Sequence, residues 1–142
     1  MRERHQDSRG WLSIDALNEQ VIEVRVGGAL SPELGAAFPR FARQAAARAE
    51  RCSVFLDVRE LASFDGAVRA AWLDAVLEHR RRLDEVVVLS RGVLVTWSAR
   101  AASVALAPFG VRFDVLTDEH RYLARRMQRV GYSAIEPIIA AG

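Results

Sequence analysis

The sequence predicts an α/β protein whose mixed central sheet has about five strands and is flanked by about four helices. The first observation is that strand-like and helix-like stretches alternate along the chain from residue 52 to residue 130. Strands separated by helices are expected to pair in parallel, since a crossover helix is the usual connection between parallel strands. The second observation is a pair of strand-like stretches near the N-terminus, joined by the turn-like Asn18-Glu19-Gln20. They predict an N-terminal hairpin that extends the parallel sheet.

The strands are predicted from short apolar runs. Residues 11–17 form a weak strand pattern, whereas over residues 21–26 the apolar Ile22, Val24 and Val26 alternate cleanly with their neighbours. Such alternation is typical of a half-buried strand. Three further runs, at residues 52–58, 85–89 and 111–116, predict the parallel strands.

The helices are predicted from apolar residues at helical spacing and from their end signals. The first begins at Ser31-Pro32, a good N-cap followed by the residue favoured at the first helical position, and reaches about residue 50. Pro39 should kink this helix or split off its first turns. The other helices are expected at residues 67–79, 93–107 and 118–130, and the last should bury Leu123, Met127 and Val130.

Composition indicates a single soluble domain. The chain has 142 residues, 51% of them hydrophobic and 27% charged, which suits one domain with a sizeable core. We expect a disordered segment at 1–10, a domain at 11–131 and a C-terminal tail at 132–142. No apolar run has the length of a membrane span, and the N-terminus does not resemble a signal peptide, so a cytoplasmic protein without stable membrane insertion is expected. The net charge of +2 predicts no nucleic-acid partner.

The stretch from Cys52 to Leu77 combines a buried strand, a polar loop and the start of a helix. Two acidic residues mark the ends of the loop, and large apolar residues stand four and seven positions after the first of them. The frame is filled by Asp57, Leu61, Phe64, Asp65, Gly66 and Ala67. In this spacing the stretch resembles the core of a STAS domain, the module of sulfate transporters and anti-sigma-factor antagonists. The order of elements around it fits that family from about residue 21 to residue 130.

The resemblance implies a STAS-like fold and a non-enzymatic regulatory domain that binds an unknown protein partner in a bacterial signalling system. The family's phosphorylated Ser or Thr would fall at Ala67, which has no hydroxyl, so the domain should not be phospho-switched at that position. The candidate interaction loop consists of Asp57, Ser63, Asp65, Gly66 and Ala67.

Few residues suggest catalysis or metal binding. Asp57 and Asp65 could act as an acid and a base, but hydrogen bonding to loop amides and helix capping are the favoured roles. The three histidines, His5, His79 and His120, do not have metal-ligand spacing, and no phosphate-binding or dinucleotide motif exists. Catalytic, metal and cofactor sites are therefore not expected. The single cysteine, Cys52, should be buried and inert.

Arginines recur every four residues in the last predicted helix, at 121, 125 and 129, with Arg126 beside them. They could form a patch that binds phosphate groups of lipid or nucleic acid. A solvated face, opposite the apolar face of the same helix, is the favoured reading.

Two further functions remain open beside the regulatory domain. A carrier or sensor of a small apolar or lipid ligand would need a pocket, for which Phe55, Trp72, Trp97 and Phe113 are the expected lining. A small enzyme would use Asp57 and Asp65. A homodimer is also possible, either through the exposed edge of the first strand or through the apolar residues of the C-terminal tail.

Overall fold

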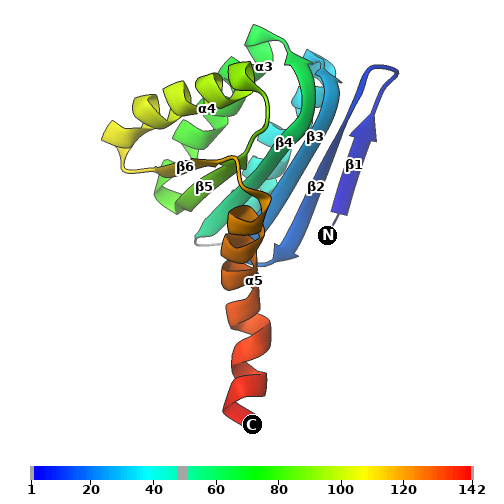
Figure 1. The fold of residues 1–142 in the computed structure, drawn as a ribbon. Helices are drawn as coiled ribbons and strands as arrows, with labels where there is room; N and C mark the ends of the chain where they lie inside the picture. The colour runs from blue at the N-terminus through cyan, green and yellow to red at the C-terminus, as the bar shows by residue number, and fades with distance from the viewer. Residues whose placement is uncertain (1, 48–50, 142) are drawn as a thin grey trace.

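The computed structural model describes residues 2–47 and 51–141, without the side chains of residues 46, 93–98 and 132–141. Its centre is one sheet of six strands in sequence order: β1 (Arg2–Gln6), β2 (Gly10–Asn18), β3 (Val21–Leu30), β4 (Cys52–Phe64), β5 (Leu83–Leu89) and β6 (Arg112–Leu116). The first three strands pair antiparallel and the pairings from β3 to β6 are parallel (Figure 1). The sequence predicts the β2–β3 hairpin and the parallel pairings, but not β1.

Five α-helices connect and cover these strands: α1 (Pro32–Gly35), α2 (Ala37–Ala46), α3 (Gly66–Glu78), α4 (Val93–Leu106) and α5 (Glu119–Ala141). Ser31 caps α1, since its hydroxyl accepts from the Leu34 amide at 3.2 Å. The first predicted helix is split into α1 and α2, and Pro39 lies in the first turn of α2, where its missing amide hydrogen is tolerated. Short 3₁₀ turns follow α3 (Arg80–Arg82) and α4 (Ala107–Phe109).

The first strand was not expected, because residues 1–10 carry no hydrophobic pattern. Nevertheless β1 pairs with β2 over five residues, from Arg2 opposite Asp15 to Gln6 opposite Trp11. The Asp7 carboxylate closes the turn by accepting from the amides of Arg9 and Gly10 at 2.8 and 2.9 Å. The edge that β2 would have offered to another chain is thus covered by a short, charged strand, a common protection against sheet extension.

The alternation of the strands divides the core between the two faces of the sheet. One face packs against α1 to α4 and includes Ile14, Val24, Val54 and Val88. The other face packs against α5 through a smaller cluster: Val21, Phe55, Val87, Leu89 and Tyr122. The fold is therefore a three-layer α/β/α arrangement, in which α5 alone covers the second face.

The last helix does not end near residue 130, as predicted, but continues to Ala141. A glycine in the left-handed conformation commonly ends a helix, but at Gly131 the helix continues. The distal part of α5 projects away from the sheet (Figure 1).

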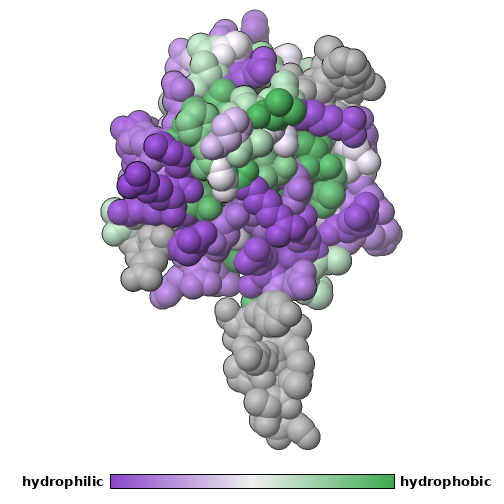
Figure 2. Space-filling model, turned by 90° about the vertical axis from the view of Figure 1, so that its left-hand side faces the viewer, coloured by the Kyte–Doolittle hydropathy of each residue, from purple (hydrophilic) through white to green (hydrophobic). Residues whose placement is uncertain are grey.

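The surface on the α4 side is divided by polarity. Figure 2 shows an apolar patch there, bordered by hydrophilic side chains.

Candidate functional site

The predicted interaction loop is not a loop. Strand β4 continues to Phe64, because β3 is long enough to pair with it as far as Leu30. The pairing register shifts twice, next to Gly27 and after Gly28, and Gly28 has a positive φ of 71° that an L side chain adopts only with strain. These irregularities let the strand bend without ending at Asp57.

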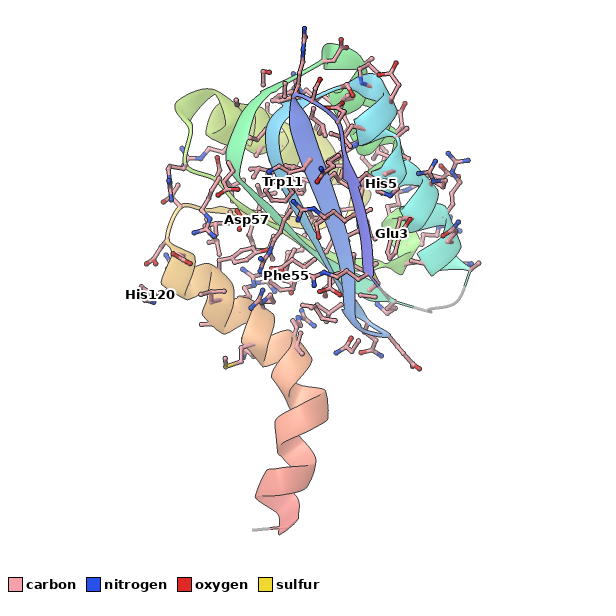
Figure 3. All side chains as sticks on the ribbon, turned by 90° about the vertical axis from the view of Figure 1, so that its right-hand side faces the viewer. Glu3, His5, Trp11, Phe55, Asp57 and His120 are labelled. Carbon is pink, nitrogen blue, oxygen red and sulfur yellow. The ribbon has the colours of Figure 1, made fainter. Side chains whose placement is uncertain are left out.

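Asp57 and Asp65 lie far apart. Eight residues of nearly extended strand separate them, which corresponds to about 26 Å at about 3.3 Å per residue. Asp57 lies on the face where α5 packs (Figure 3), whereas Asp65 caps α3 by accepting from the Ala67 amide at 2.8 Å. One reacting atom could not touch both carboxylates, so the geometry argues against a paired acid–base role.

The Asp57 carboxylate is bound by Arg59. It accepts from the Arg59 Nε and Nη2 at 3.0 and 2.8 Å and from the backbone amide of the same residue at 3.1 Å. Burial alone would raise the pKa of Asp57, but these charge-assisted bonds outweigh it and hold the pKa below 3.8. The guanidinium of Arg59 also reaches Glu119 on α5 at 3.1 Å. Asp57 therefore has a structural role that ties β4 to the start of α5.

The other three residues of the predicted loop lie around the start of α3. Ser63 pairs with Ala29 near the end of β4 and is exposed, and Gly66 and Ala67 form the exposed first turn of the helix. They are accessible, but they do not form a pocket with Asp57.

The expectation of a solvated arginine face on α5 was wrong for Arg125, Arg126 and Arg129, which bind buried carboxylates, whereas Arg121 is exposed. Arg125 Nη2 and Arg129 Nε donate to the two carboxylate oxygens of Glu85 at 2.6 and 2.7 Å, and Arg125 also pairs with Asp114. Glu85 has no exposed surface. Burial alone would lower the pKa of Arg125, but the bonds to both carboxylates raise it.

Glu23 forms a second buried cluster beside the first. Its side chain is 4% exposed and accepts from Arg126 Nη1 at 2.7 and 2.8 Å, from the Tyr122 hydroxyl at 3.1 Å and from Arg25 Nε at 3.2 Å. Burial, and then the charge of Glu23, raise the pKa of Tyr122. The pattern-based expectation that Met127 is buried was also wrong: Met127 is 64% exposed and Tyr122 takes the buried position. The sequence did contain a signal for these ion pairs. Glu23 and Glu85 stand inside apolar strand runs, where a buried carboxylate needs a cationic partner.

An apolar cavity of about 140 Å³ lies between α3, α4 and the sheet. The described part of its wall is apolar apart from Arg69 and includes Leu56, Trp72, Val76, Val88, Leu106 and Phe113. An engineered apolar cavity of about 150 Å³ holds benzene, so the volume matches a ring or a chain of about six carbons. We call this space the α3–α4 cavity.

The cavity lies between α3 and α4 because these helices pack against different neighbouring elements. Helix α3 packs on α1 and α2, and α4 packs on β6. The residues that α4 turns toward the gap include the small Ala99 and Ala102. The indole of Trp72 donates to the Gly35 carbonyl at 2.8 Å, and its ring lies 4.8 Å from that of Phe38. With its polar atom already bonded, Trp72 offers the cavity an apolar surface.

The four residues expected to line a pocket separate in the structure. Trp72 and Phe113 line the α3–α4 cavity. Phe55 does not: it lies on the opposite face, with its ring 5.7 Å from that of Tyr122 in an edge-on arrangement (Figure 3). The side chain of Trp97 lies outside the described residues.

The described residues contain no group of three or more His, Cys, Asp or Glu side chains that could hold a metal ion. His5 lies in β1 beside Glu3, His79 ends α3, and His120 lies in the first turn of α5. Over the same part of the chain, no helix is both long enough and apolar enough to cross a membrane.

Comparison with known proteins shows the fold. No protein-family model matches the sequence, and no curated protein is similar to it. Among solved structures, the chain is similar to an uncharacterized DUF3478-family protein with a SpoIIAA-like fold from Shewanella loihica PV-4. The match has a TM-score of 0.58 at 17% identity and covers 87% of this chain and 90% of the other. The chain therefore has the SpoIIAA-like, STAS-type fold that the order of its elements predicts.

Proposed function

We propose that this protein is a non-enzymatic binding domain that takes up a small apolar ligand in the α3–α4 cavity. The observation that carries the proposal is the cavity itself, with about 140 Å³ and an almost entirely apolar described wall. Protein interiors are normally packed to crystal density, so a space of this size is unusual. A ligand of the right shape would supply the contacts that the apolar wall lacks while the space is empty.

The chemistry of the wall restricts the ligand to apolar groups. Trp72 Nε1 already donates to a backbone carbonyl, and Leu56, Val88 and Phe113 have no polar side-chain atoms. A ligand in this space gains affinity from buried apolar area, at about 25 cal/mol per Å². Apart from the Arg69 guanidinium, the described part of this wall offers no polar side chain to a ligand, which suits storage or sensing better than chemical conversion.

Benzene is a suitable probe because its size matches the cavity. Saturating benzene should raise the melting temperature of the wild-type protein, since a ligand that binds only the folded state stabilises it by mass action. Replacement of Ala102 by Leu should fill the cavity, raise the stability by about 0.5–2 kcal/mol and abolish the response to benzene.

The matched control is Ala101→Leu, at an exposed position of the same helix that does not line the cavity. This variant should keep the wild-type response. A wild-type melting temperature that does not respond to benzene would refute the proposal, as would an Ala102→Leu variant that responds like the wild type.

A second candidate is the regulatory domain that acts by binding a protein partner. It is supported by apolar side chains exposed on α4 and just after it: Val104 on α4 is 74% exposed and Phe109, just after α4, is 52% exposed. Exposed apolar groups of this kind are common at protein contacts. Replacement of Val104 by Asp should weaken binding to a partner and leave the benzene response intact, which separates the two candidates.

A further inference from the structure

A smaller crevice lies beneath the C-terminal end of α3. It has a volume of about 40 Å³ and lies between α2, α3 and the first residues of β3, β4 and β5. Phe38, Val54 and Val76 line both this crevice and the α3–α4 cavity. The two spaces therefore adjoin and follow the underside of α3 along the sheet.

The crevice differs from the larger cavity because its lining includes a polar group without a partner. His79, the residue that follows α3, lines the crevice, and its Nε2 atom is buried. No hydrogen bond to that atom is found in the described part of the chain. A buried polar atom left unpaired is costly, so such atoms usually have a partner in the functional state. A crevice of this size has room for a small polar group or for water.

Charges of both signs lie around the crevice. Arg82, in the turn Arg80–Arg82, lines the crevice together with His79. At the Cys52 wall the thiol adds no charge at neutral pH, because burial, followed by the negative charge of Asp84, raises its pKa to about 11. A negatively charged group would therefore be favoured on the side of His79 and Arg82 rather than on the side of Cys52.

We propose that the ligand is an amphiphile, a carboxylic acid with a short apolar tail of about six to eight carbons. The tail occupies the α3–α4 cavity, and the carboxylate lies in the crevice, where it accepts a hydrogen bond from His79 Nε2 beside Arg82. This inference rests on the proposed function and adds the polar end of the ligand to it. The Phe38 and Val76 side chains stand between the two spaces, so they must shift when such a ligand binds.

The test compares hexanoate, 1-hexanol and hexylamine, which share a six-carbon tail, by calorimetry on the full chain and by the chemical shift of the His79 ring. Hexanoate should bind about tenfold or more tightly than hexanol, since a hydrogen bond to a charged group is worth about 1.5–3 kcal/mol. Hexylamine should bind most weakly. Hexanoate, and not hexanol, should shift the Nε2 resonance.

Variants test the role of the histidine. His79→Phe removes the nitrogen and should bring hexanoate down to the affinity of hexanol, whereas His79→Gln keeps a donor and should retain part of the preference. Arg81→Gln is the matched control, because Arg81 is exposed on the same turn and does not line the crevice. The Arg81→Gln variant should keep at least half of the tenfold preference for hexanoate over hexanol.

The outcomes separate this inference from the proposed function. Benzene binding with equal affinities for hexanoate and hexanol would overturn the carboxylate site and leave the apolar cavity standing. Loss of the preference in Arg81→Gln as well as in His79→Phe would assign it to the general positive charge of the turn and overturn the role of His79. If His79→Phe fails to fold, the comparison of the three ligands on the wild-type protein decides the matter.

Discussion

Removal of the two arginines that neutralise Glu85 should destabilise the protein more than removal of Glu85 itself. In an Arg125→Met/Arg129→Met variant, the carboxylate of Glu85 loses donors at 2.6 and 2.7 Å while it remains without exposed surface. Leaving a buried charge without its partner costs about 3–5 kcal/mol. A domain of this size has about 5–15 kcal/mol of stability in total, so the loss is a large share.

The reverse change should be milder. In Glu85→Gln, Arg125 still pairs with Asp114, and the Arg129 side chain, 40% exposed, can turn to water. The expected cost is about 1.5–3 kcal/mol, the value of hydrogen bonds to charged groups. Arg121→Met is the control, because Arg121 is exposed on the same helix, and its cost should stay within about 0.5 kcal/mol.

Urea unfolding at pH 7, followed by circular dichroism, measures these differences as changes in the free energy of unfolding. The reasoning fails if Glu85→Gln costs as much as the double arginine variant. It also fails if the double variant loses less than about 1 kcal/mol, the level of an exposed ion pair.

Three further predictions concern single residues. Asp57→Asn should lower the free energy of unfolding by about 1–3 kcal/mol at pH 7. Since the Arg59 bonds hold the folded-state pKa of Asp57 below its ordinary value, the gap to the wild type should narrow as the pH falls through that lowered pKa; a gap that does not change with pH would contradict the Arg59 bonds. Asp65→Ala should cost about 0.5–2 kcal/mol as a lost helix cap in thermal melts, and no loss would exclude capping. Native Cys52 should react with iodoacetamide at pH 8 far more slowly than in urea, because its pKa is raised to about 11; equal rates would show an accessible thiol.

The sequence was sufficient for the fold because most strands and helices keep their hydrophobic period. The alternation in Val21–Leu30 and the capping signals at Ser31 and Asp65 are local, and local signals survive in the folded chain. The strand Arg2–Gln6 was missed because its stabilisation comes from pairing with β2, and its own side chains are polar.

The candidate site was harder to predict for two physical reasons. A hydrophobic pattern places apolar residues toward the sheet and charged residues toward water, but buried ion pairs invert this on α5. Arg125 and Arg126 face the sheet, while Met127 faces water. The second reason is that a cavity is a gap between packed elements and not a property of any one residue. The apolar residues Trp72 and Phe113 were identified from the sequence, but the divergence of α3 and α4 depends on how each helix packs on its neighbours, which no local pattern encodes.

Xenon under pressure probes the α3–α4 cavity itself, because xenon binds apolar cavities without hydrogen bonds or charge. In a crystal of the full chain exposed to xenon, we expect an anomalous-scattering peak between α3 and α4, in contact with Trp72, Val76 and Phe113. The peak should be absent in the Ala102→Leu variant. A crystal in which xenon occupies other sites but leaves the α3–α4 cavity empty would refute the apolar binding site.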